Sequence, residues 1–240
     1  MKILIVGYGK MGKIIEQKAI SRGNEVPFKI NSANKELLKT LTDKDVDVAI
    51  EFSQPERAFN NIKQCLENNI PVVCGTTGWL DKRAEIEQLC KEKNGTFFYA
   101  SNYSVGVNLF FHLNKILARI MNNYPQYEAS IEEIHHTNKK DAPSGTAITL
   151  AEGIISNSSR KNHWVNEKAK AENELEIISK RIDPCPGTHT ITYDSNVDSI
   201  EIKHTAHNRE GFAEGAVVAA EWLYGKKGVF GMDDLLKISY

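Results

Sequence analysis

The feature that most constrains the fold is a regular alternation of short apolar runs with longer segments of helical period over residues 1–100. This alternation is typical of βαβ units, in which helices connect parallel strands and pack on the sheet. We therefore expect a doubly wound parallel sheet. Its strands are expected at Lys2–Val6, Glu25–Ile30, Asp47–Glu51, Pro71–Cys74 and Thr96–Tyr99. Its helices are expected at Lys10–Ser21, Lys35–Thr40, Pro55–Asn68 and Trp79–Lys93.

The pattern changes at Val105, where a long helix, Val105–Asn122, is predicted to carry one apolar stripe. The expected stripe consists of Phe110, Leu113, Ile116, Leu117 and Ile120. An extended run, Tyr127–His135, follows. Because successive strand side chains alternate between faces, Ala129, Ile131, Glu133 and His135 are expected to share one face.

The remainder predicts a mostly antiparallel or mixed sheet with flanking helices. Helices are expected from Ser144 to about Ser156, at Phe212–Tyr224 and at Met232–Lys237, and strands near Leu175–Arg181, Thr188–Tyr193 and Asp198–Thr205. The polar stretch Asn157–Glu174 fits either a solvent-facing helix or a mobile loop.

A glycine fingerprint directly follows the first strand. Gly7 permits a tight turn, Gly9 lets the backbone approach a pyrophosphate, and Gly12 lets helix and strand pack closely. The helix after it offers free N–H groups to an anion. With Tyr8, Lys10 and Met11 between the glycines, the loop predicts dinucleotide binding. A tight turn without a ligand is the alternative.

The end of the second expected strand bears on cofactor choice. The acidic residue that usually binds the adenosine ribose of NAD is missing there. Instead the chain reads Lys29-Ile30-Asn31-Ser32, with Lys35 close behind. These groups could hold a 2′-phosphate, so we expect NADPH to bind at least as well as NADH. The alternative is an ordinary solvated loop.

Two further strand ends should face the same crevice, because α/β folds bind ligands at the carboxyl ends of their strands. Phe52 and Ser53 follow the third strand, and Gly75-Thr76-Thr77-Gly78 follows the fourth. The glycines leave room for a flat ring, and the threonines offer hydroxyl and N–H groups to a carboxamide. A strand-to-helix turn capped by threonine is the alternative.

The segment Glu133–Ala147 concentrates groups that can hold and protonate an anion. His135 and His136 should point in opposite directions on an extended chain. Histidine titrates near neutral pH, and Lys139 can stabilise developing negative charge. Ser144, Gly145 and Thr146 begin a helix, where N–H groups and hydroxyls favour a carboxylate or phosphate. A basic, solvated loop capped by serine is the alternative.

The bulk composition limits the partners. A formal net charge of -1 supplies no general field for DNA or an anionic membrane, so neither is expected to bind. The four cysteines show no C-x-x-C pairing and no zinc-ligand spacing, so we expect buried free thiols and no metal. The N-terminal apolar run ends at Gly7, too early for a signal peptide, which favours the cytoplasm.

The run from His135 to Ala147 resembles the signature of the dihydrodipicolinate reductase family. The resemblance extends along most of the chain, in the same order and spacing. It includes the glycine fingerprint, Gly75–Gly78, Asn102–Asn108, Gly187-Thr188-His189, and Arg209-x-x-Phe212-Ala213-x-Gly215-Ala216.

This resemblance implies an α/β protein with an inserted α+β domain built on a mixed sheet. Residues 1–104 and 209–240 would form a Rossmann-like dinucleotide-binding domain, and residues 105–208 a substrate-binding and oligomerisation domain. It also implies a homotetramer, and NAD(P)H-dependent reduction of 4-hydroxy-tetrahydrodipicolinate to tetrahydrodipicolinate in diaminopimelate and lysine biosynthesis. After loss of water, hydride would add to C4 of the conjugated imine, and the resulting enamine would be protonated at C3.

The family's site residues carry over to matching positions. His135 would be the acid/base residue and Lys139 would assist protonation. The substrate carboxylates would lie among His136, Lys139, Lys140, Gly145 and Thr146, and the nicotinamide pocket among Gly75, Thr77, Ser101, Asn102 and Tyr103. Tyr103 departs mildly from the family, which often has phenylalanine there. Two rivals remain: another NAD(P) enzyme with a nucleophilic cysteine or a different acid/base set, and a non-catalytic redox sensor.

Overall fold

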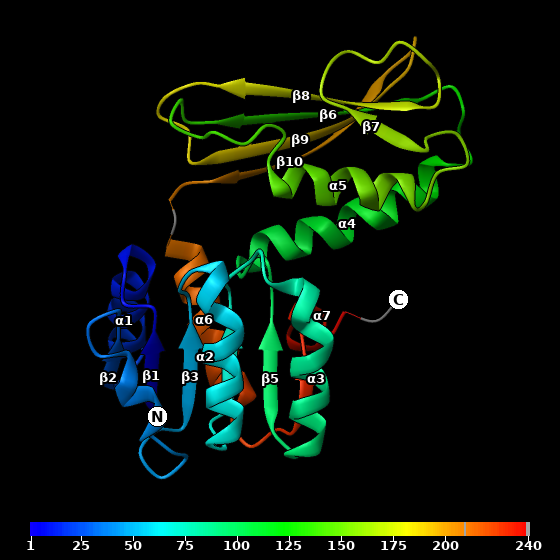
Figure 1. Ribbon diagram of the computed structural model, residues 1–240. Helices are drawn as coiled ribbons and strands as arrows, with labels where there is room; N and C mark the ends of the chain where they lie inside the picture. Colours follow the sequence, from blue (N-terminus) through cyan, green and yellow to red (C-terminus); the bar gives the residue numbers. More distant parts are fainter. Residues whose placement is uncertain (209, 239–240) are drawn as a thin grey trace. The chain divides into compact units, whose positions relative to one another are not determined.

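The computed structural model describes residues 1–208 and 210–238, which form two compact units (Figure 1). The first contains Met1–Val105 together with Glu210–Tyr240, and the second contains Gly106–Arg209. The divisions expected at 104/105 and 208/209 lie within one residue of these. Arg209, which belongs to the last motif quoted above, lies outside the described residues.

The first unit is built on a six-stranded sheet in the order β11-β5-β4-β3-β1-β2, with every pair parallel. Its strands are β1 Lys2–Val6, β2 Glu25–Ile30, β3 Val48–Glu51, β4 Val72–Cys74, β5 Thr96–Tyr99 and β11 Gly228–Phe230. The expected doubly wound fold is confirmed. The sequence prediction omitted β11, which is three residues long and too short to show a periodic pattern.

Helices cover both faces of this sheet (Figure 1). They are α1 Lys10–Ser21, α2 Pro55–Glu67, α3 Arg83–Glu92, α6 Glu210–Leu223 and α7 Met232–Leu236. Alternate strand residues such as Leu4 and Ile5 enter opposite cores, one with α2 and α3 and the other with α1 and α6. The helix expected at 35–40 is a 3-10 helix, η1 Lys35–Lys39, and a second, η2 Leu80–Lys82, precedes α3.

The second unit is built on a five-stranded mixed sheet in the order β10-β9-β6-β8-β7. Its elements are α4 Val105–Met121, β6 Glu128–His135, α5 Gly145–Ile155, β7 His163–Val165, β8 Glu174–Arg181, β9 Gly187–Asp194 and β10 Ser199–Ala206. The β6 strand pairs antiparallel with β9 and parallel with β8. The core contains residues of α4 and α5 together with Ile131, Ile177 and Ile191 from the three central strands.

The prediction of one apolar stripe on α4 is wrong. Phe110 is 7% exposed and lies in the core, whereas Leu113 and Ile120 are 48% and 52% exposed. The buried line also contains Asn114, Ala118 and Met121. Because α4 is apolar on two sides, the sequence pattern could not distinguish the row of apolar residues that faces the core from the row that faces solvent.

The stretch 157–174, which the sequence left open, is a loop that contains the short strand β7 and ends at the first residue of β8. The side chain of Lys161 is 2% exposed. Its Nζ donates to the carbonyl oxygens of Glu172 and Glu174, both at 2.8 Å, and also contacts the Glu128 carboxylate. A buried lysine thus organises this stretch. No helix in the described part of the chain is long and apolar enough to span a membrane.

Candidate active site

The first unit contains a cavity of about 650 Å³ at the carboxyl ends of β1, β2 and β3. Eight of the residues predicted to bind the cofactor line it: Gly7, Tyr8, Gly9, Lys10, Met11, Lys35, Phe52 and Ser53. Asn31 and Ser32, named as phosphate ligands, do so as well. Gln54, which follows β3 next to Ser53, lines it too, and the sequence prediction missed Arg57 and Asn61 of α2.

The three glycines of the fingerprint are needed for different structural reasons. Gly7 has a φ of +100°, and a Cβ there would lie 2.2 Å from the carbonyl oxygen of Phe52. A Cβ at Gly12 would lie 2.5 Å from the carbonyl oxygen of Gly7. A Cβ at Gly9 would meet nothing within 4 Å. Gly7 and Gly12 are therefore required by the protein itself, and Gly9 keeps the cavity side of the loop open.

The charge of the cavity is one-sided. Lys10, Lys35 and Arg57 line it, and among the described lining residues there is no Asp or Glu. Lys29 does not belong to this set, because its Nζ lies 2.7 Å from Glu16 Oε1. Glu16 also accepts a hydrogen bond from the Tyr8 hydroxyl. Of the two lysines that the sequence suggested for a 2′-phosphate, Lys35 lines the cavity and Lys29 does not.

The residues predicted for the nicotinamide pocket follow β4 and β5, outside the lining of this cavity. Thr77 and Ser101 are exposed, and Asn102 is half-buried. Tyr103 is 2% exposed, and its hydroxyl donates to the Cys74 carbonyl oxygen at 2.7 Å. A Cβ at Gly75 would lie 2.2 Å from the Phe52 ring, so this glycine makes room for that ring. The nicotinamide assignment stays a prediction.

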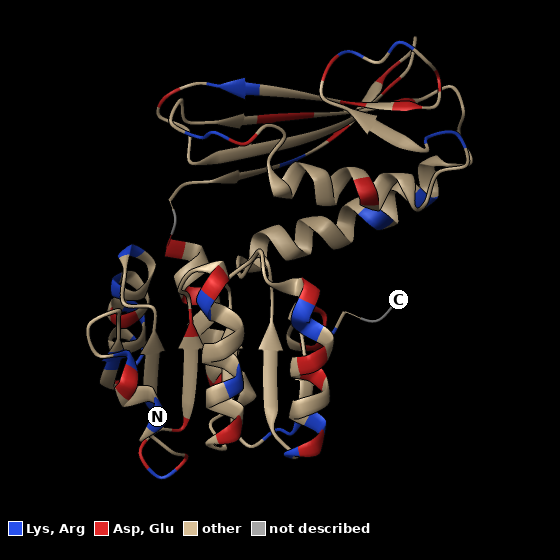
Figure 2. Ribbon diagram, viewed as in Figure 1, with Lys and Arg blue, Asp and Glu red and all other residues tan. Residues whose placement is uncertain are grey.

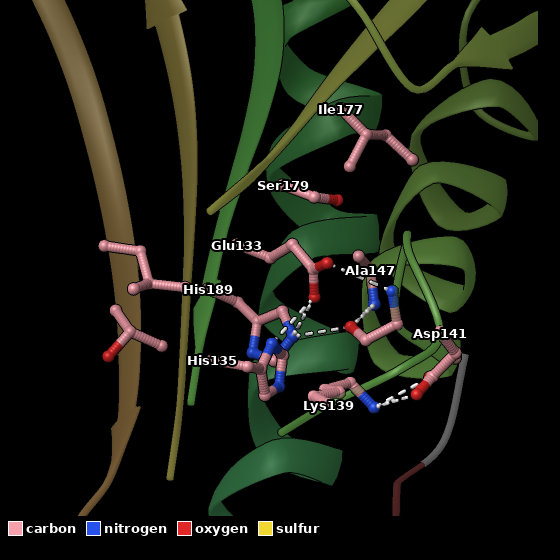
Figure 3. Close-up of polar contacts among 12 residues, drawn as sticks. Glu133, His135, Lys139, Asp141, Ala147, Ile177, Ser179 and His189 are labelled. Atoms are coloured by element: carbon pink, nitrogen blue, oxygen red, sulfur yellow. Dashed lines mark hydrogen bonds and ion pairs between the residues drawn. The ribbon is translucent and has the colours of Figure 1, made fainter. Parts of the chain in front are cut away.

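The second unit places a polar cluster on the core face of its sheet (Figure 3). The β6 strand lies between β8 and β9, and Glu133 pairs with Ser179 on one side and His189 on the other. His135, two residues further along β6, pairs with Arg181. Because paired residues point to the same face, strand register brings these five side chains together.

Glu133 is the centre of the cluster, with an exposed fraction of 0%. Its Oε1 accepts hydrogen bonds from Ser144 N at 3.2 Å and Arg181 Nη2 at 3.0 Å, and its Oε2 lies 2.9 Å from His135 Nδ1. Burial alone would raise the pKa of Glu133. Hydrogen bonds from His135, Ser144, Ser179 and Arg181 outweigh it and hold the pKa well below its usual range. The carboxylate is therefore ionised inside the protein.

His189 approaches the same carboxylate from β9. Its Nε2 lies 3.1 Å from Ser144 Oγ and 3.9 Å from Glu133 Oε2, and its ring centroid lies 5.1 Å from that of His135. Burial and the neighbouring His135 lower the pKa of His189 to about 4. His189 is thus a neutral imidazole at neutral pH, which leaves it without a proton to donate from a cationic ring.

The loop between β6 and α5 carries the cations. Lys139 Nζ donates to both carboxylate oxygens of Asp141, at 2.8 and 2.7 Å, and this interaction lowers the pKa of Asp141. Arg181 Nη2 donates to the Asp141 carbonyl oxygen at 2.6 Å. His136 is half-buried, and Lys140 is exposed. Lys139 therefore lies beside the cluster with its charge held by an exposed carboxylate (Figure 3).

The start of α5 completes the site. Ser144 is the N-cap of α5, and its Oγ accepts from Ala147 N at 3.2 Å. Gly145 is exposed and Thr146 is half-buried, and a Cβ at Gly145 would meet nothing within 4 Å. The helix start is thus open at Gly145, where N–H groups can receive a carboxylate. This open helix start lies next to the buried His189, which contacts Ser144.

Sequence reasoning placed His135 and Ser144 in the site but did not assign Glu133, Ser179, Arg181 or His189. One signal was present, since a carboxylate on the apolar face of a predicted strand needs a partner. Arg181 lies 48 residues from Glu133, and only strand register brings them together.

The atoms of Glu133, His135 and His189 lie within 4.8 Å of one another, a spacing that metal ligands can adopt. Arg181 and the Ser144 N–H already occupy the same carboxylate. A divalent cation would add charge beside a guanidinium in a buried site, which is unfavourable. The arrangement therefore fits a hydrogen-bonded acid/base group better than a metal centre.

Comparisons with known proteins agree along the whole chain. The family models for the N-terminus and the C-terminus of dihydrodipicolinate reductase match residues 1–103 and 106–236. A 4-hydroxy-tetrahydrodipicolinate reductase from Christiangramia forsetii is 49% identical over 236 residues, which cover 98% of each chain. One from Methanoregula boonei is 35% identical over 207 residues, covering 85% of this chain and 80% of the relative.

A solved structure extends the comparison to the fold. A dipicolinate-bound dihydrodipicolinate reductase from Paenisporosarcina sp. TG-14 matches with a TM-score of 0.75 and 22% sequence identity, covering 98% of each chain. At this identity the match shows the shared fold alone.

Proposed function

The chain belongs to the dihydrodipicolinate reductase family, and from this premise we propose that it reduces 4-hydroxy-tetrahydrodipicolinate to tetrahydrodipicolinate with NADPH or NADH. The observation that carries the proposal is a buried carboxylate–histidine pair, Glu133 and His135, beside the open start of α5. This combination can bind a small dicarboxylate and also protonate it.

Each residue has a chemical task in this proposal. The N–H groups at Gly145 and Thr146, together with Lys139 and His136, hold the substrate carboxylates. After the substrate loses its 4-hydroxyl group as water, bound NAD(P)H would supply the hydride that adds to C4 of the conjugated imine. Lys139 and the start of α5 stabilise the negative charge that develops on the substrate. His135 then donates a proton at C3, and Lys139 assists.

The cofactor proposal rests on the charge of the cavity in the first unit. Lys35 and Arg57 are available to a 2′-phosphate, and no acid among the described lining residues opposes it. We therefore expect NADPH to be at least as good a cofactor as NADH. Gly75, Thr77, Ser101, Asn102 and Tyr103 are proposed to form the nicotinamide pocket.

The assembly proposal rests on α4. Leu109, Leu113 and Ile120 are 50%, 48% and 52% exposed, and charged residues are sparse along this helix (Figure 2). An exposed apolar row of this kind favours self-association. A homotetramer is the state we propose, and size measurement by light scattering would test it. The cytoplasmic location stays a prediction.

The rivals account for less of the site. A dehydrogenase with a nucleophilic cysteine needs a reactive thiol, but Cys74 is buried, and burial raises the pKa of its thiol. A redox sensor without catalysis leaves the buried Glu133–His135 pair without a task.

The deciding experiment follows the absorbance of NADPH after addition of freshly generated 4-hydroxy-tetrahydrodipicolinate. The proposal predicts NADPH oxidation with formation of tetrahydrodipicolinate in equal amount. Cofactor binding without oxidation would support the sensor. Oxidation with an amino acid or aldehyde, and none with the dicarboxylate, would support the dehydrogenase.

A further inference from the structure

We propose that Glu133 is a positioning residue that fixes the proton arrangement of the His135 ring, a role that rests on the proposed function of His135 as the proton donor. Glu133 holds the proton on Nδ1, so that Nε2 is the nitrogen that delivers the proton to the substrate. The proposal stands on the geometry around the two oxygens of one carboxylate.

The two oxygens of Glu133 have separate partners. Oε1 receives two N–H donors, Ser144 N at 3.2 Å and Arg181 Nη2 at 3.0 Å. Oε2 lies 2.9 Å from His135 Nδ1 and 3.9 Å from His189 Nε2, and Ser179 also donates a hydrogen bond to this carboxylate. The contact falls outside the geometry of a well-aligned hydrogen bond, but an ionised carboxylate would repel a bare ring nitrogen 2.9 Å away, so this distance favours a proton on Nδ1. The neutral His135 ring is then protonated at Nδ1 and bare at Nε2.

The opposite edge of the ring lies against a glycine. Nε2 of His135 lies near Gly187, where a Cβ would stand only 3.0 Å away. A glycine at 187 therefore keeps the edge that bears Nε2 uncrowded. His135 keeps 8% of its surface exposed, so this buried ring still reaches solvent.

The proton transfer balances with this arrangement. In the imidazolium both nitrogens are protonated. The Nε2–H bond breaks as the C3–H bond of the substrate forms. The electron pair of the enamine makes the new C–H bond, and the electron pair of the broken N–H bond stays on Nε2. The product ring is neutral, with its remaining proton on Nδ1 facing Glu133. Water then returns a proton to Nε2, and neither ring nor carboxylate has to move.

Replacement by glutamine would reverse this arrangement. Glutamine has one oxygen and one NH₂ group, and the donors Ser144 N and Arg181 Nη2 both require the oxygen. The NH₂ group would then face His135 Nδ1, which can accept only when it is bare. The neutral ring would hold its proton on Nε2, and a second proton on Nδ1 would oppose the NH₂ group.

Other charges face the ring from each neighbouring element. Arg181 comes from β8, neutral His189 comes from β9, and Lys139 and Asp141 come from the loop before α5. Within the described cluster Glu133 is the charged group that contacts Nδ1 directly. Its replacement should therefore change the proton arrangement of the ring more than a change at any of these neighbours.

The first test reads the ring directly by NMR, with ¹⁵N-labelled histidine in the full chain at alkaline pH. His135→Gln assigns the signal by removing it. We expect a proton on Nδ1 in the unsubstituted protein and on Nε2 in Glu133→Gln. A proton on Nε2 in the unsubstituted protein overturns the proposal, and this arm decides even if Glu133→Gln fails to fold.

The second test compares kcat–pH profiles of Glu133→Gln and a matched control, Glu132→Gln. Glu132 lies on the same strand with its side chain 37% exposed and paired to Lys180. Glu133→Gln should lower kcat about 10²-fold, since misplacing the proton forfeits most of a general acid's contribution. The shape of its kcat–pH profile should differ from that of Glu132→Gln, and KM should change little. Glu133→Asp should recover part of kcat, and Glu132→Gln should match the unsubstituted enzyme.

The outcomes separate this proposal from the proposed function. If the unsubstituted enzyme fails to reduce the dicarboxylate but His135 holds its proton on Nδ1, the proposed function is overturned and the pairing stands. If the enzyme is active and Glu133→Gln keeps the pH profile of Glu132→Gln, the positioning role alone is overturned.

Discussion

The two units achieve recognition in contrasting ways. The cavity of the first unit is shaped by backbone: Gly7 and Gly12 allow close approach, and its cations reach in from solvent-facing segments. The cluster of the second unit is made of side chains on the core face of a sheet, around Glu133 with an exposed fraction of 0%. The first arrangement suits binding of a large anion. The second suits control of a single proton, because burial strengthens each electrostatic contact.

The largest expected effect tests whether the second unit carries out the chemistry while the first binds the cofactor. His135→Gln and Lys139→Ala should each lower kcat by about 10²-fold or more, because a positioned acid and a neighbouring cation contribute on that scale. NADPH affinity, measured by fluorescence titration, should stay nearly unchanged. Normal turnover in both variants would remove the catalytic assignment, and a parallel loss of NADPH binding would contradict the separation.

The next effect concerns stability and sharpens the description of the buried cluster. The pKa of His189 falls from 6.5 to about 4 on folding, so between these values the unfolded chain binds a proton that the folded chain does not. This difference has no effect on stability above pH 6.5, the pKa of His189 in the unfolded chain. As the pH falls toward the folded-state pKa of about 4, it progressively destabilises the fold. Between about pH 8 and about pH 5 it amounts to at most about 2 kcal/mol.

Urea unfolding at these two pH values would measure it. His189→Gln does not titrate and should lose less stability on acidification than the unsubstituted protein. Equal losses in the two proteins would show that His189 is not the group responsible.

A smaller effect tests whether backbone shape at the glycine loop determines cofactor binding in the first unit. Gly9→Ala should leave the unfolding midpoint almost unchanged, because its Cβ would meet nothing within 4 Å. It should weaken NADPH binding about 10-fold, equivalent to about 1.4 kcal/mol, by obstructing the approach of the pyrophosphate. Gly7→Ala is the contrasting variant and should destabilise the fold, since its Cβ would lie 2.2 Å from a backbone oxygen. Unchanged NADPH affinity in Gly9→Ala would contradict the assignment of the loop.

The smallest effect concerns cofactor choice. Lys35→Ala should lower kcat/KM with NADPH about 5-fold and leave NADH nearly unaffected, because an exposed lysine contributes about 1 kcal/mol to a phosphate contact. Lys29→Ala is the matched control, since Lys29 is paired with Glu16 and does not line the cavity. A tenfold preference of the unsubstituted enzyme for NADH would show that the basis for choosing Lys35 is wrong.

The contrast between the units also explains what the sequence could predict. The strands and helices of the first unit follow from local periodicity, and the glycine fingerprint is contiguous, so its place on β1 and α1 was accessible. The predictions that failed concern one very short strand and one helix with two apolar sides. β11 has three residues, and α4 is apolar on both its core and solvent sides.

The buried cluster was less accessible because it depends on register. The alternation of β6 correctly placed Glu133 and His135 on one inward face. Their partners His189 and Arg181 come from β9 and β8, and no local pattern states which residue of those strands lies opposite. Lys29 illustrates the same limit, since its ion pair with Glu16 of α1 removed it from the predicted phosphate site.

The most direct measurement of the central claim is a single turnover with NADPH bound to the enzyme before 4-hydroxy-tetrahydrodipicolinate is added. The absorbance of the reduced nicotinamide should fall rapidly in the unsubstituted enzyme. In His135→Gln it should persist, with the cofactor still bound, for about 10²-fold longer. Equally rapid oxidation in both proteins would contradict the account, because the proton-donating cluster of the second unit would then have no part in the reaction.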